Sequence, residues 1–380
     1  MSRKKLLILC YEYPPIGGGG AKVVAGLINQ FRHKALDIDL VTMWYRTLKM
    51  IERVDNLTIH RAFCIRRKKS VCIPSEMILY LVTGFFLAYR LQRKNHYWLN
   101  HTHFIFPDGL ISLLLKKATG LPYVITAHGS DVPGYNPDRF RLLHRILLPL
   151  WKEVARNAEC IICPSATIET LILKCFRKAK TTIIPNGIEV DRFRADLKKE
   201  AKILLVTRMF ERKGVQYFLQ AIRGLDEDFQ IHIVGDGPYL ERLKEMAKQY
   251  NLQVKFHGCL PNRGLELKDL FETSRIFVFT SEAENFPVVL LEAMTAGMAI
   301  LTTRGTGCAE VVGESGILVR VKNPNAIREN LIILMRDPEL CHKLGKAARE
   351  RVEKYFIWEV VAEKYLLLYE QGLLRAKPNT

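Results

Sequence analysis

Short apolar runs alternate with longer amphipathic segments along most of the chain. The runs have the length of buried strands, and the segments between them are long enough to form crossover helices. This alternation is typical of parallel strands linked by helices in an α/β fold. The strands that we expect occupy residues 6–10, 38–43, 58–63, 98–103, 123–127, 160–163 and 181–184, and then residues 203–207, 230–234, 254–257, 276–280, 298–302 and 317–319.

The alternation is interrupted at residues 189–202, where charged residues are frequent and large apolar residues are few. Because the 380 residues exceed the size at which one hydrophobic core stops growing, we expect a domain boundary there. Beyond Pro324 apolar residues recur every three or four positions, which indicates helices. We therefore predict two facing Rossmann-like domains at residues 1–190 and 200–355, followed by a C-terminal helix at 356–380 that returns towards the first domain.

The formal net charge of +18 favours acidic ligands, an anionic membrane surface or nucleic acid as partners. No RRM, KH, zinc-finger or basic-zipper pattern occurs, so we expect no nucleic-acid partner. The nine cysteines are scattered, mostly inside apolar runs, which favours reduced thiols in a cytoplasmic protein. The N-terminal segment has no cleavage site, and its apolar run is too short to span a membrane.

An apolar segment at residues 75–94 lies between two basic clusters, at residues 66–69 and 90–94. Such a segment either docks on an anionic membrane or packs in the core as a helix with basic ends. Ser75 suits the N-cap of this helix, and Glu76 suits its first turn. Because polar residues are too few for a strong amphipathic pattern, we favour a core helix whose basic flanks contact the membrane. This places the protein in the cytoplasm, with a peripheral position on the inner face of the membrane as the alternative.

A glycine-rich loop follows the first expected strand, in the segment YEYPPIGGGG. Ligands of open parallel sheets bind beyond the carboxyl ends of the strands. Gly18 and Gly19 lie just before a helix, where backbone N–H groups without side chains can cradle a phosphate. A flexible loop is the alternative, since the segment lacks the GxGxxG pattern with a following acid that is typical of a dinucleotide site.

Arg208 and Lys213 occupy the matching position of the second domain, after the strand KILLVTR. The planar fork of arginine and the point charge of lysine can together clamp a diphosphate, whereas the alternative is a solvated basic loop. Further on, Gly235 opens the tight turn VGDGP. Such a turn brings the backbone close to a ligand or to a neighbouring chain segment, and the sequence leaves both open.

The strongest local signal is the segment SEAENFPVVLLEAM. It places Glu284, Asn285 and Phe286 in a loop, Pro287 at the first position of a helix and Glu292 about two turns later. The helix N-terminus can receive a diphosphate, while Glu292 reaches a ribose and Glu284 reaches a sugar. The apolar neighbours of Glu292 are not those of an ordinary solvated acid. We therefore predict that this segment binds a ligand that contains a diphosphate, a ribose and a sugar.

His101 and His103 share one face of an expected strand, as metal ligands do. No third ligand accompanies them, so we predict no metal site, with His103 lining the cleft and His101 structural. No Asp-x-Asp motif follows a strand either. We therefore expect activity without a divalent metal or any other cofactor.

In combination, these motifs resemble the retaining GT-B glycosyltransferases of family four over nearly the whole chain. The resemblance rests on PPIGGGG, TAHGSDV, PNGIEVDRF, the segment from Arg208 to Gly214, VGDGP, FHG and ENFPVVLLEAM. The resemblance implies the GT-B fold, with the active site in the cleft between the two domains and the nucleotide diphosphate on the second. It also implies that Arg208 and Lys213 contact the phosphates and that Glu292 contacts the ribose.

The same resemblance implies that His128 and Glu284 face the transferred sugar. Asp131 then either binds the acceptor or steadies His128. Two positions depart from the common pattern, since Asn285 and Thr306 stand where glycine is frequent. These departures bear on the choice of donor rather than on the phosphate clamp.

The implied reaction transfers a sugar from a UDP- or GDP-linked donor to a carbohydrate or lipid-linked acceptor, with retention of the anomeric configuration. It would serve cell-surface polysaccharide or glycolipid biosynthesis. The expected catalytic residues are His128, Arg208, Lys213 and Glu284. No second acid pairs with Glu284 as in a glycoside hydrolase, which favours a hydrogen-bonding role over a nucleophilic one. A sugar-nucleotide epimerase of similar fold and a non-catalytic nucleotide-binding scaffold are the alternatives.

Overall fold

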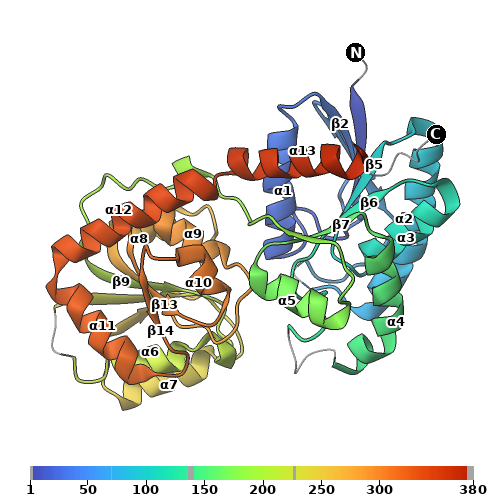
Figure 1. Ribbon diagram of the computed structural model, residues 1–380. Coiled ribbons are helices and arrows are strands. Elements are labelled where there is room, and N and C mark those ends of the chain that lie inside the picture. The colour runs from blue at the N-terminus through green and yellow to red at the C-terminus, as the bar shows by residue number, and fades with distance from the viewer. Residues whose placement is uncertain (1–2, 70, 136–140, 226–227, 375–380) are drawn as a thin grey trace. The chain divides into compact units, whose positions relative to one another are not determined.

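The computed structural model describes residues 3–69, 71–135, 141–225 and 228–374 (Figure 1). The chain forms two compact units, of which the first comprises Met1–Gly187 with Trp358–Thr380 and the second comprises Ile188–Ile357. Each unit is built on a mostly parallel sheet with helices, which confirms the predicted α/β class.

The boundary between the units lies ahead of the polar stretch where we expected it. Ile188 N donates to Phe356 O at 2.8 Å, and Ile188 pairs with Ile357 in a parallel bridge. Lys199 Nζ donates to the carbonyl oxygens of Glu272 and Ala296 at 2.7 and 2.6 Å. The polar residues after position 187 therefore belong to the second unit, because their side chains satisfy backbone groups of its helices.

The described part of the first sheet has the strand order β3-β4-β2-β1-β5-β6-β7-β8, and only β3 runs antiparallel to its neighbour. Most of its strands are buried runs, as the sequence pattern indicates. Its strands are β1 (Lys4–Leu9), β2 (Leu36–Met43), β3 (Ile51–Val54), β4 (Leu57–Ala62), β5 (Leu99–His103), β6 (Tyr123–Thr126), β7 (Cys160–Cys163) and β8 (Thr181–Ile183).

Strand β3 is absent from our sequence-based expectations. It is a short edge strand in which Ile51 and Val54 are exposed, so it has no buried apolar run for a pattern to detect. A turn with Asp55 at φ +54° connects it to β4, and Glu52 accepts a hydrogen bond from Arg61 at 2.8 Å. Pairing across this turn, rather than burial, therefore defines β3.

The helices of the first unit form two groups. Helix α13 packs against α1, whereas α3 packs against both α2 and α4 (Figure 1). These helices are α1 (Gly19–Phe31), α2 (Pro74–Asn95), α3 (Asp108–Thr119), α4 (Arg141–Asn157), α5 (Ala166–Cys175) and α13 (Trp358–Leu374).

Helix α2 begins earlier than expected. Ile73 is its N-cap and Pro74 its first residue, so the prediction of Ser75 as the N-cap is wrong. Glu76 does satisfy backbone groups at this end, since its carboxylate accepts from Ile73 N at 3.1 Å and from Arg67 N at 2.9 Å. An acidic side chain in the first turn therefore stabilises the helix start in place of a serine cap.

The C-terminal helix is part of the core of the first unit. The indole of Trp358 lies against the backbone of Gly26 and Gly187, where an added Cβ atom would come within 2.3 and 2.4 Å of ring atoms. Tyr369 Oη lies 2.7 Å from His101 Nδ1, and Tyr365 Oη lies 3.2 Å from Thr126 Oγ1. Residues at the end of the chain thus complete the packing behind β5 and β6.

The described part of the second sheet has the parallel order β11-β10-β9-β12-β13-β14. Its strands are β9 (Glu200–Val206), β10 (Gln230–Val234), β11 (Val254–Phe256), β12 (Ser274–Phe279), β13 (Ala299–Thr303) and β14 (Ile317–Val319). Its helices are α6 (Val215–Ala221), α7 (Leu240–Gln249), α8 (Leu265–Thr273), α9 (Val288–Thr295), α10 (Gly307–Val312), α11 (Pro324–Arg336) and α12 (Pro338–Tyr355), with short 3₁₀ turns η1 (Val190–Arg192) and η2 (Glu211–Lys213).

Two hydrophobic clusters cover the faces of the second sheet. Ile203 and Leu205 belong to one cluster, and Leu204 belongs to the other. Successive residues of a strand point to opposite faces, so a strand that is buried on both sides reads as a continuous apolar run. The continuous apolar run in KILLV therefore indicates a central strand.

We expect Gly26→Ala to lower the thermal unfolding midpoint. The new Cβ would press on the indole of Trp358, and overpacking typically costs about 1–3 kcal/mol, against a gain of about 1 kcal/mol in helix propensity. Calorimetry of Gly19→Ala is the control, since a Cβ there meets nothing within 4 Å. Trp358→Phe should recover part of the loss in Gly26→Ala. An unchanged midpoint in Gly26→Ala would contradict the packing.

Candidate functional site

The loops at the carboxyl ends of β9 and β10 are packed backbone against backbone. Gly235 has φ +134°, and a Cβ on it would lie 1.7 Å from Thr207 O. Met209 N donates to Asp236 O at 2.9 Å. Of the two interpretations of the VGDGP turn, close contact with a neighbouring segment is therefore observed. The contact sets the position of the loop that carries Arg208.

Lys213 and Glu284 are brought together by a second close contact of this kind. Gly214 has φ +68°, and a Cβ on it would lie 2.1 Å from Thr280 O. Thr280 Oγ1 donates to Gly214 O at 2.9 Å. With the end of η2 held against the loop after β12, Lys213 Nζ forms an ion pair with Glu284 Oε1. The two side chains are 9% and 11% exposed, so each charge depends on the other.

Arg208 differs from Lys213 in its surroundings. It is exposed at the end of β9, and its guanidinium carbon lies 5.6 Å from the centroid of the Phe210 ring. Contact with an aromatic face orients the planar donor fork. The predicted clamp thus consists of one accessible cation and one that is paired with Glu284. Because an ammonium has three donors, Lys213 can bind an anion while it keeps Glu284.

Glu292 is buried on α9 and forms an ion pair with Arg192 of η1. Arg192 also donates to Asn262 O and lies 4.8 Å from the centroid of the Phe193 ring. This pairing explains how an acid stands among apolar neighbours. Sequence reasoning missed Arg192. Its position in PNGIEVDRF, one of the motifs of the resemblance, was the available signal.

The segment after Glu284 packs against the start of α10. Gly307 N donates to Glu284 O at 3.0 Å, and a Cβ on Gly307 would lie 1.5 Å from Asn285 O. Thr306, which stands where glycine is frequent, caps this helix because its Oγ1 accepts from Cys308 N at 3.2 Å. The threonine therefore has a structural role at the helix start.

Two residues of the predicted donor segment are placed differently from our expectation. The side chain of Phe286 is buried in the core, with its ring centroid 5.5 Å from that of Phe356, so it does not offer a donor-binding face. Pro287 is the N-cap of α9, and the helix begins at Val288 rather than at the proline. The apolar packing of Phe286 fixes the loop that presents Glu284.

In the first unit, β5 and β6 bring two histidines together. His103 Nδ1 lies 3.1 Å from His128 Nε2. Burial lowers the pKa of His128 to about 3 and lowers that of His103 well below its ordinary value. Both imidazoles are therefore neutral near pH 7. Gly20 lies on the other side of the His128 ring, where an added Cβ would be 3.3 Å from Nδ1.

Asp131 steadies the histidine loop. Its carboxylate accepts from His128 N at 2.9 Å and from Ile105 N at 2.7 Å, and the side chain is buried. Burial raises the pKa of Asp131 to about 6, although the backbone donors oppose this rise. Of the two roles that the resemblance left open, the contacts are those of a residue that holds His128 in place.

His101 lies behind these residues as a structural histidine. Its Nε2 lies 2.8 Å from Thr126 Oγ1, and burial lowers its pKa to about 3. The rings of His101 and His103 are 4.2 Å apart between centroids. The two rings are tilted by 42° to one another, and both are neutral near pH 7.

The glycine-rich loop is anchored through its first residues, while Gly18 and Gly19 stay open. Gly17 N donates to Lys69 O at 2.8 Å, and an added Cβ on Gly18 or Gly19 would meet nothing within 4 Å. Gly18 is the N-cap of α1 and has no side-chain cap. The structure thus leaves space for a ligand beside these backbone groups.

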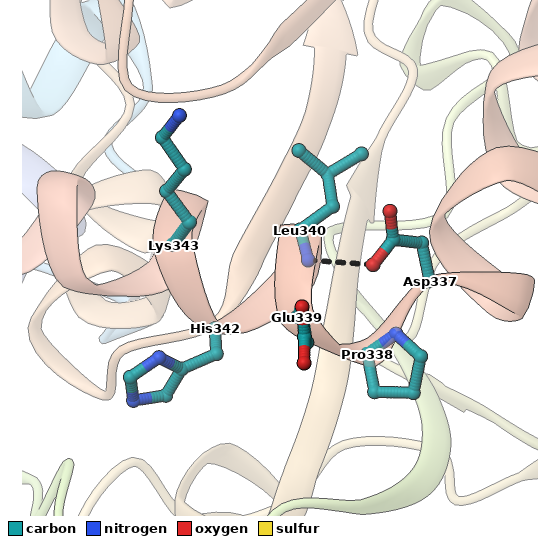
Figure 2. Close-up of a pocket in the computed structure, with 6 residues that line it drawn as sticks. All are labelled: Asp337, Pro338, Glu339, Leu340, His342 and Lys343. Carbon is teal, nitrogen blue, oxygen red and sulfur yellow. Dashed lines mark hydrogen bonds between the residues drawn. The ribbon is translucent and has the colours of Figure 1, made fainter.

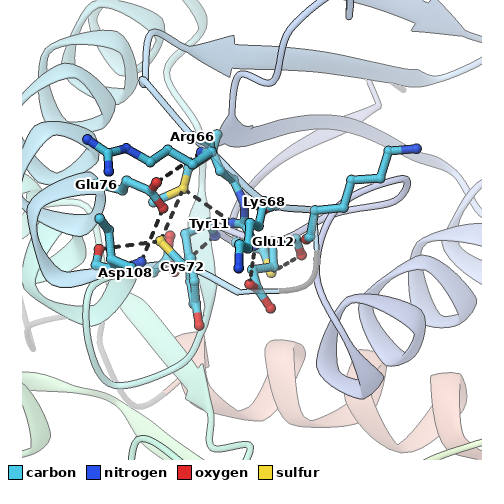
Figure 3. Close-up of polar contacts among 12 residues, drawn as sticks. Tyr11, Glu12, Arg66, Lys68, Cys72, Glu76 and Asp108 are labelled. Carbon is cyan, nitrogen blue, oxygen red and sulfur yellow. Dashed lines mark hydrogen bonds and ion pairs between the residues drawn. The ribbon is translucent and has the colours of Figure 1, made fainter. Parts of the chain in front are cut away.

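Arg66 stabilises the segments beside the glycine-rich loop. Figure 3 shows its side chain beside Glu12, and the Arg66 Nη2 to Glu12 Oε1 distance is 2.7 Å. Arg66 also donates to the carbonyl oxygens of Lys68 and Lys69 at 2.9 and 3.0 Å. The expectation that Arg66 contacts a membrane is therefore wrong, because its guanidinium is buried and satisfied internally.

Asp108 lies beneath the start of the loop, within the cluster drawn in Figure 3. Its carboxyl group accepts from Tyr80 Oη at 2.7 Å and from Tyr11 N at 3.1 Å. Burial raises the pKa of Asp108 to about 8 despite these donors. The residue was not predicted, because a single acid in the first turn of a helix gives no sequence signal of burial.

The hollow drawn in Figure 2 is separate from these loops. It is lined by Asp337, Pro338, Glu339, Leu340, His342 and Lys343 at the start of α12. Asp337 Oδ1 accepts from Leu340 N at 2.8 Å, which is an ordinary helix cap. The hollow contains none of the predicted site residues.

The raised pKa of Asp108 predicts that stability falls as pH rises from about 4 to about 8. Between about pH 4 and pH 8 the native carboxyl binds a proton that the unfolded chain has released, so stability falls as pH rises. Asp108→Asn removes the titration, and the unfolding midpoint should then fall less between about pH 5.5 and 8.5. Asp228→Asn, at an exposed acid, should behave as the wild type. An identical pH profile for Asp108→Asn would refute this role.

Comparison with known proteins adds to this geometry. Residues 17–192 match the model of Glycosyltransferase Family 4, and residues 188–351 match that of Glycosyl transferases group 1. The chain is 26% identical to N-acetyl-alpha-D-glucosaminyl L-malate synthase of Bacillus anthracis over 388 residues, which cover 96% of each protein.

Two solved structures share the fold. Sucrose-phosphate synthase from Thermosynechococcus elongatus superposes with a TM-score of 0.81 at 23% identity, covering 99% of this chain and 100% of that one. Anabaena HepE in complex with UDP superposes with a TM-score of 0.75 at 15% identity, covering 97% and 100%. With the two family models matched in order along the chain, this protein belongs to the glycosyltransferases, with a Glycosyltransferase Family 4 first half and a glycosyl transferases group 1 second half.

Proposed function

We propose that this glycosyltransferase takes its sugar from a nucleotide diphosphate donor, UDP- or GDP-linked, that binds the second unit. The Lys213–Glu284 ion pair carries the proposal, because it places a cation beside the acid that we assign to the sugar, at the edge of the sheet. HepE, which shares the fold, is a UDP-bound structure, and this supports a nucleotide donor. The acceptor is a carbohydrate or a lipid-linked molecule, and the protein works peripherally at the inner face of a membrane.

The diphosphate would lie between Arg208 and Lys213. Arg208 is exposed and offers a bidentate fork, while Lys213 offers the ammonium donors that Glu284 does not use. Glu292 would accept from the ribose hydroxyls. Its pairing with Arg192 orients the carboxylate for this contact.

The proposed reaction retains the anomeric configuration. The bond from the sugar C1 to the diphosphate oxygen breaks, and the acceptor hydroxyl oxygen bonds to C1 on the same face. The departing phosphate oxygen takes the hydroxyl proton, so no enzyme nucleophile is needed. Arg208 and Lys213 neutralise the charge that develops on the diphosphate, which makes a divalent metal unnecessary.

The neutral state of His128 suits an oxocarbenium-like centre. An imidazolium near this centre would repel the positive charge that develops at C1, whereas a neutral ring can hydrogen-bond a sugar hydroxyl. Burial keeps the pKa of His128 at about 3, so the ring stays neutral throughout the physiological range. We therefore propose a positioning and hydrogen-bonding role for His128 rather than proton transfer.

The rate of sugar transfer should depend on Arg208 and Lys213. Removing one preorganised donor of developing charge typically costs about 3–4 kcal/mol, so Arg208→Ala and Lys213→Ala should each lower kcat on the order of a hundredfold or more. Turnover is measured with a screen of UDP- and GDP-sugars against carbohydrate and lipid-linked acceptors, with product detected by mass spectrometry. Excess EDTA should leave the rate unchanged.

Two controls separate chemistry from folding. Arg223→Ala removes an exposed arginine that lies 5.2 Å from the Tyr250 ring, much as Arg208 lies by Phe210, and should keep full activity. Lys213→Met with Glu284→Gln removes both charges of the pair, which should restore stability but not turnover.

Loss of activity in EDTA with recovery on adding magnesium would show that a metal carries the diphosphate charge. The proposed clamp would then be wrong.

Glu292→Gln should weaken the binding of UDP about tenfold, because hydrogen bonds to a charged group contribute about 1.5–3 kcal/mol. Isothermal titration calorimetry with UDP measures this. Glu272→Gln is the matched control, since Glu272 is likewise a buried helical acid paired with a cation, Lys268, at 2.7 Å. Equal UDP affinity in wild type and a folded Glu292→Gln variant would remove the ribose assignment.

A further inference from the structure

Helix α2 is only half buried, which corrects our expectation of a core helix. One face is buried through residues such as Tyr80, Gly84 and Ala88. The opposite face exposes Ile78, Val82 and Phe86, whose exposed fractions are 62%, 53% and 65%. We call these three residues the α2 ridge. They follow one another at every fourth position and therefore form a single line along the helix, about 12 Å long.

The segment before α2 extends the apolar surface. Phe63 and Ile65 are exposed, and Phe63 is held beside the helix because Thr83 Oγ1 donates to Phe63 O at 2.8 Å. Cys64 Sγ lies 3.4 Å from Glu76 O, so the segment follows the first turns of α2. The segment that carries the exposed Phe63 and Ile65 thus runs beside α2, and the Phe63 ring stacks on that of Trp44 with the centroids 6.0 Å apart. Scattered single apolar residues are normal on a surface, but a group on adjacent segments marks an interaction site.

Exposed cations flank the α2 ridge at both ends. Arg67, Lys68 and Lys69 precede the helix and are exposed. Arg90, Arg93 and Lys94 are exposed near its C-terminal end. The sequence from residue 63 to residue 94 contains one acid, Glu76, which is buried. This segment therefore combines exposed apolar side chains with positive charge, and its one acid is buried.

We propose that the α2 ridge and its flanking cations dock the first unit on an anionic lipid surface. Ile78, Val82 and Phe86 enter the boundary between headgroups and acyl chains, while the cations bind the headgroups. None of the described helices is long and apolar enough to cross a membrane. An apolar stripe with basic ends fits a helix that lies in the interface plane.

The cations at both ends of the α2 ridge favour an anionic bilayer over a protein partner. A protein would have to present an apolar groove with acidic rims at both ends, whereas an anionic bilayer offers both features everywhere on its surface. The docking surface rests on the proposal that the protein works peripherally at the inner face of a membrane. Binding of UDP to the second unit is measured separately, so the two proposals can fail independently.

Vesicle sedimentation with the full chain tests the docking surface. Wild type should bind vesicles that contain phosphatidylglycerol and should bind pure phosphatidylcholine weakly. The ridge variant, Ile78→Gln with Val82→Gln and Phe86→Gln, should partition at least about tenfold more weakly, because three apolar side chains no longer leave water. The control variant, Leu265→Gln with Ile333→Gln and Leu367→Gln, changes residues that are 85%, 50% and 56% exposed elsewhere. It should bind as the wild type does.

Two further variants and one control test the roles of charge and of insertion. Arg67→Gln with Lys68→Gln and Lys69→Gln should weaken binding and reduce its dependence on salt, since these cations act through the surface potential. Phe86→Trp should show a blue shift of tryptophan emission with anionic vesicles, whereas Leu265→Trp should not. Binding without this shift would show that the α2 ridge does not insert and would overturn the proposal.

Two more outcomes would reject the docking surface. The first is equal vesicle binding by the wild type and the ridge variant. The second is a wild type that sediments as a dimer without vesicles while the ridge variant is a monomer, which would assign the ridge to self-association. Calorimetry with UDP on every variant keeps the donor site separate. Loss of vesicle binding with UDP affinity retained supports the docking surface, whereas a wild type that binds vesicles but neither UDP nor GDP contradicts only the proposed donor.

Discussion

A charge that is removed from water needs a partner, and this requirement organises the carboxyl edge of the second sheet. Lys213 comes from η2 after β9 and Glu284 from the loop after β12, and their side chains are only 9% and 11% exposed because each charge has the other as its partner. Arg192 and Glu292 repeat the arrangement between η1 and α9. Removing either member would leave an uncompensated charge, so the ion pairs constrain the positions of these loops. The site is therefore preorganised by electrostatic pairing on top of sheet packing.

Close backbone contacts hold the loops that carry Lys213 and Arg208. Gly214 allows η2 to approach Thr280 O, and Gly235 allows the next loop to approach Thr207 O, at distances that leave no space for a side chain. The contact at Gly214 holds η2 against the loop after β12. This brings Lys213 Nζ to Glu284 Oε1. The two kinds of interaction depend on one another, since the backbone contact sets the distance and the ion pair satisfies the charges that it buries.

The first unit meets the same constraint in two ways. Arg66 is buried with Glu12 as its counter-ion, and this pair holds the base of the glycine-rich loop. His101, His103 and His128 have no acidic partner among their described ring contacts, and burial keeps them neutral. A neutral histidine cluster beside a glycine-rich loop provides hydrogen bonds without adding charge. The cations that remain exposed, such as Arg67 and Arg90, are left to interact with partners outside the chain.

The sequence by itself determined the alternation of strands and helices, the two α/β units and the motifs that carry Arg208, Lys213, Glu284 and Glu292. These features depend on local periodicity and on residue type, which a single chain displays directly. The tertiary structure decided what depends on neighbours from elsewhere in the chain. It paired the exposed β3 with β4, supplied Arg192 to Glu292 and turned Phe286 into the core. It also left one apolar face of α2 in solvent, because the core needs only the face that contains Tyr80, whereas the sequence shows apolar residues on both.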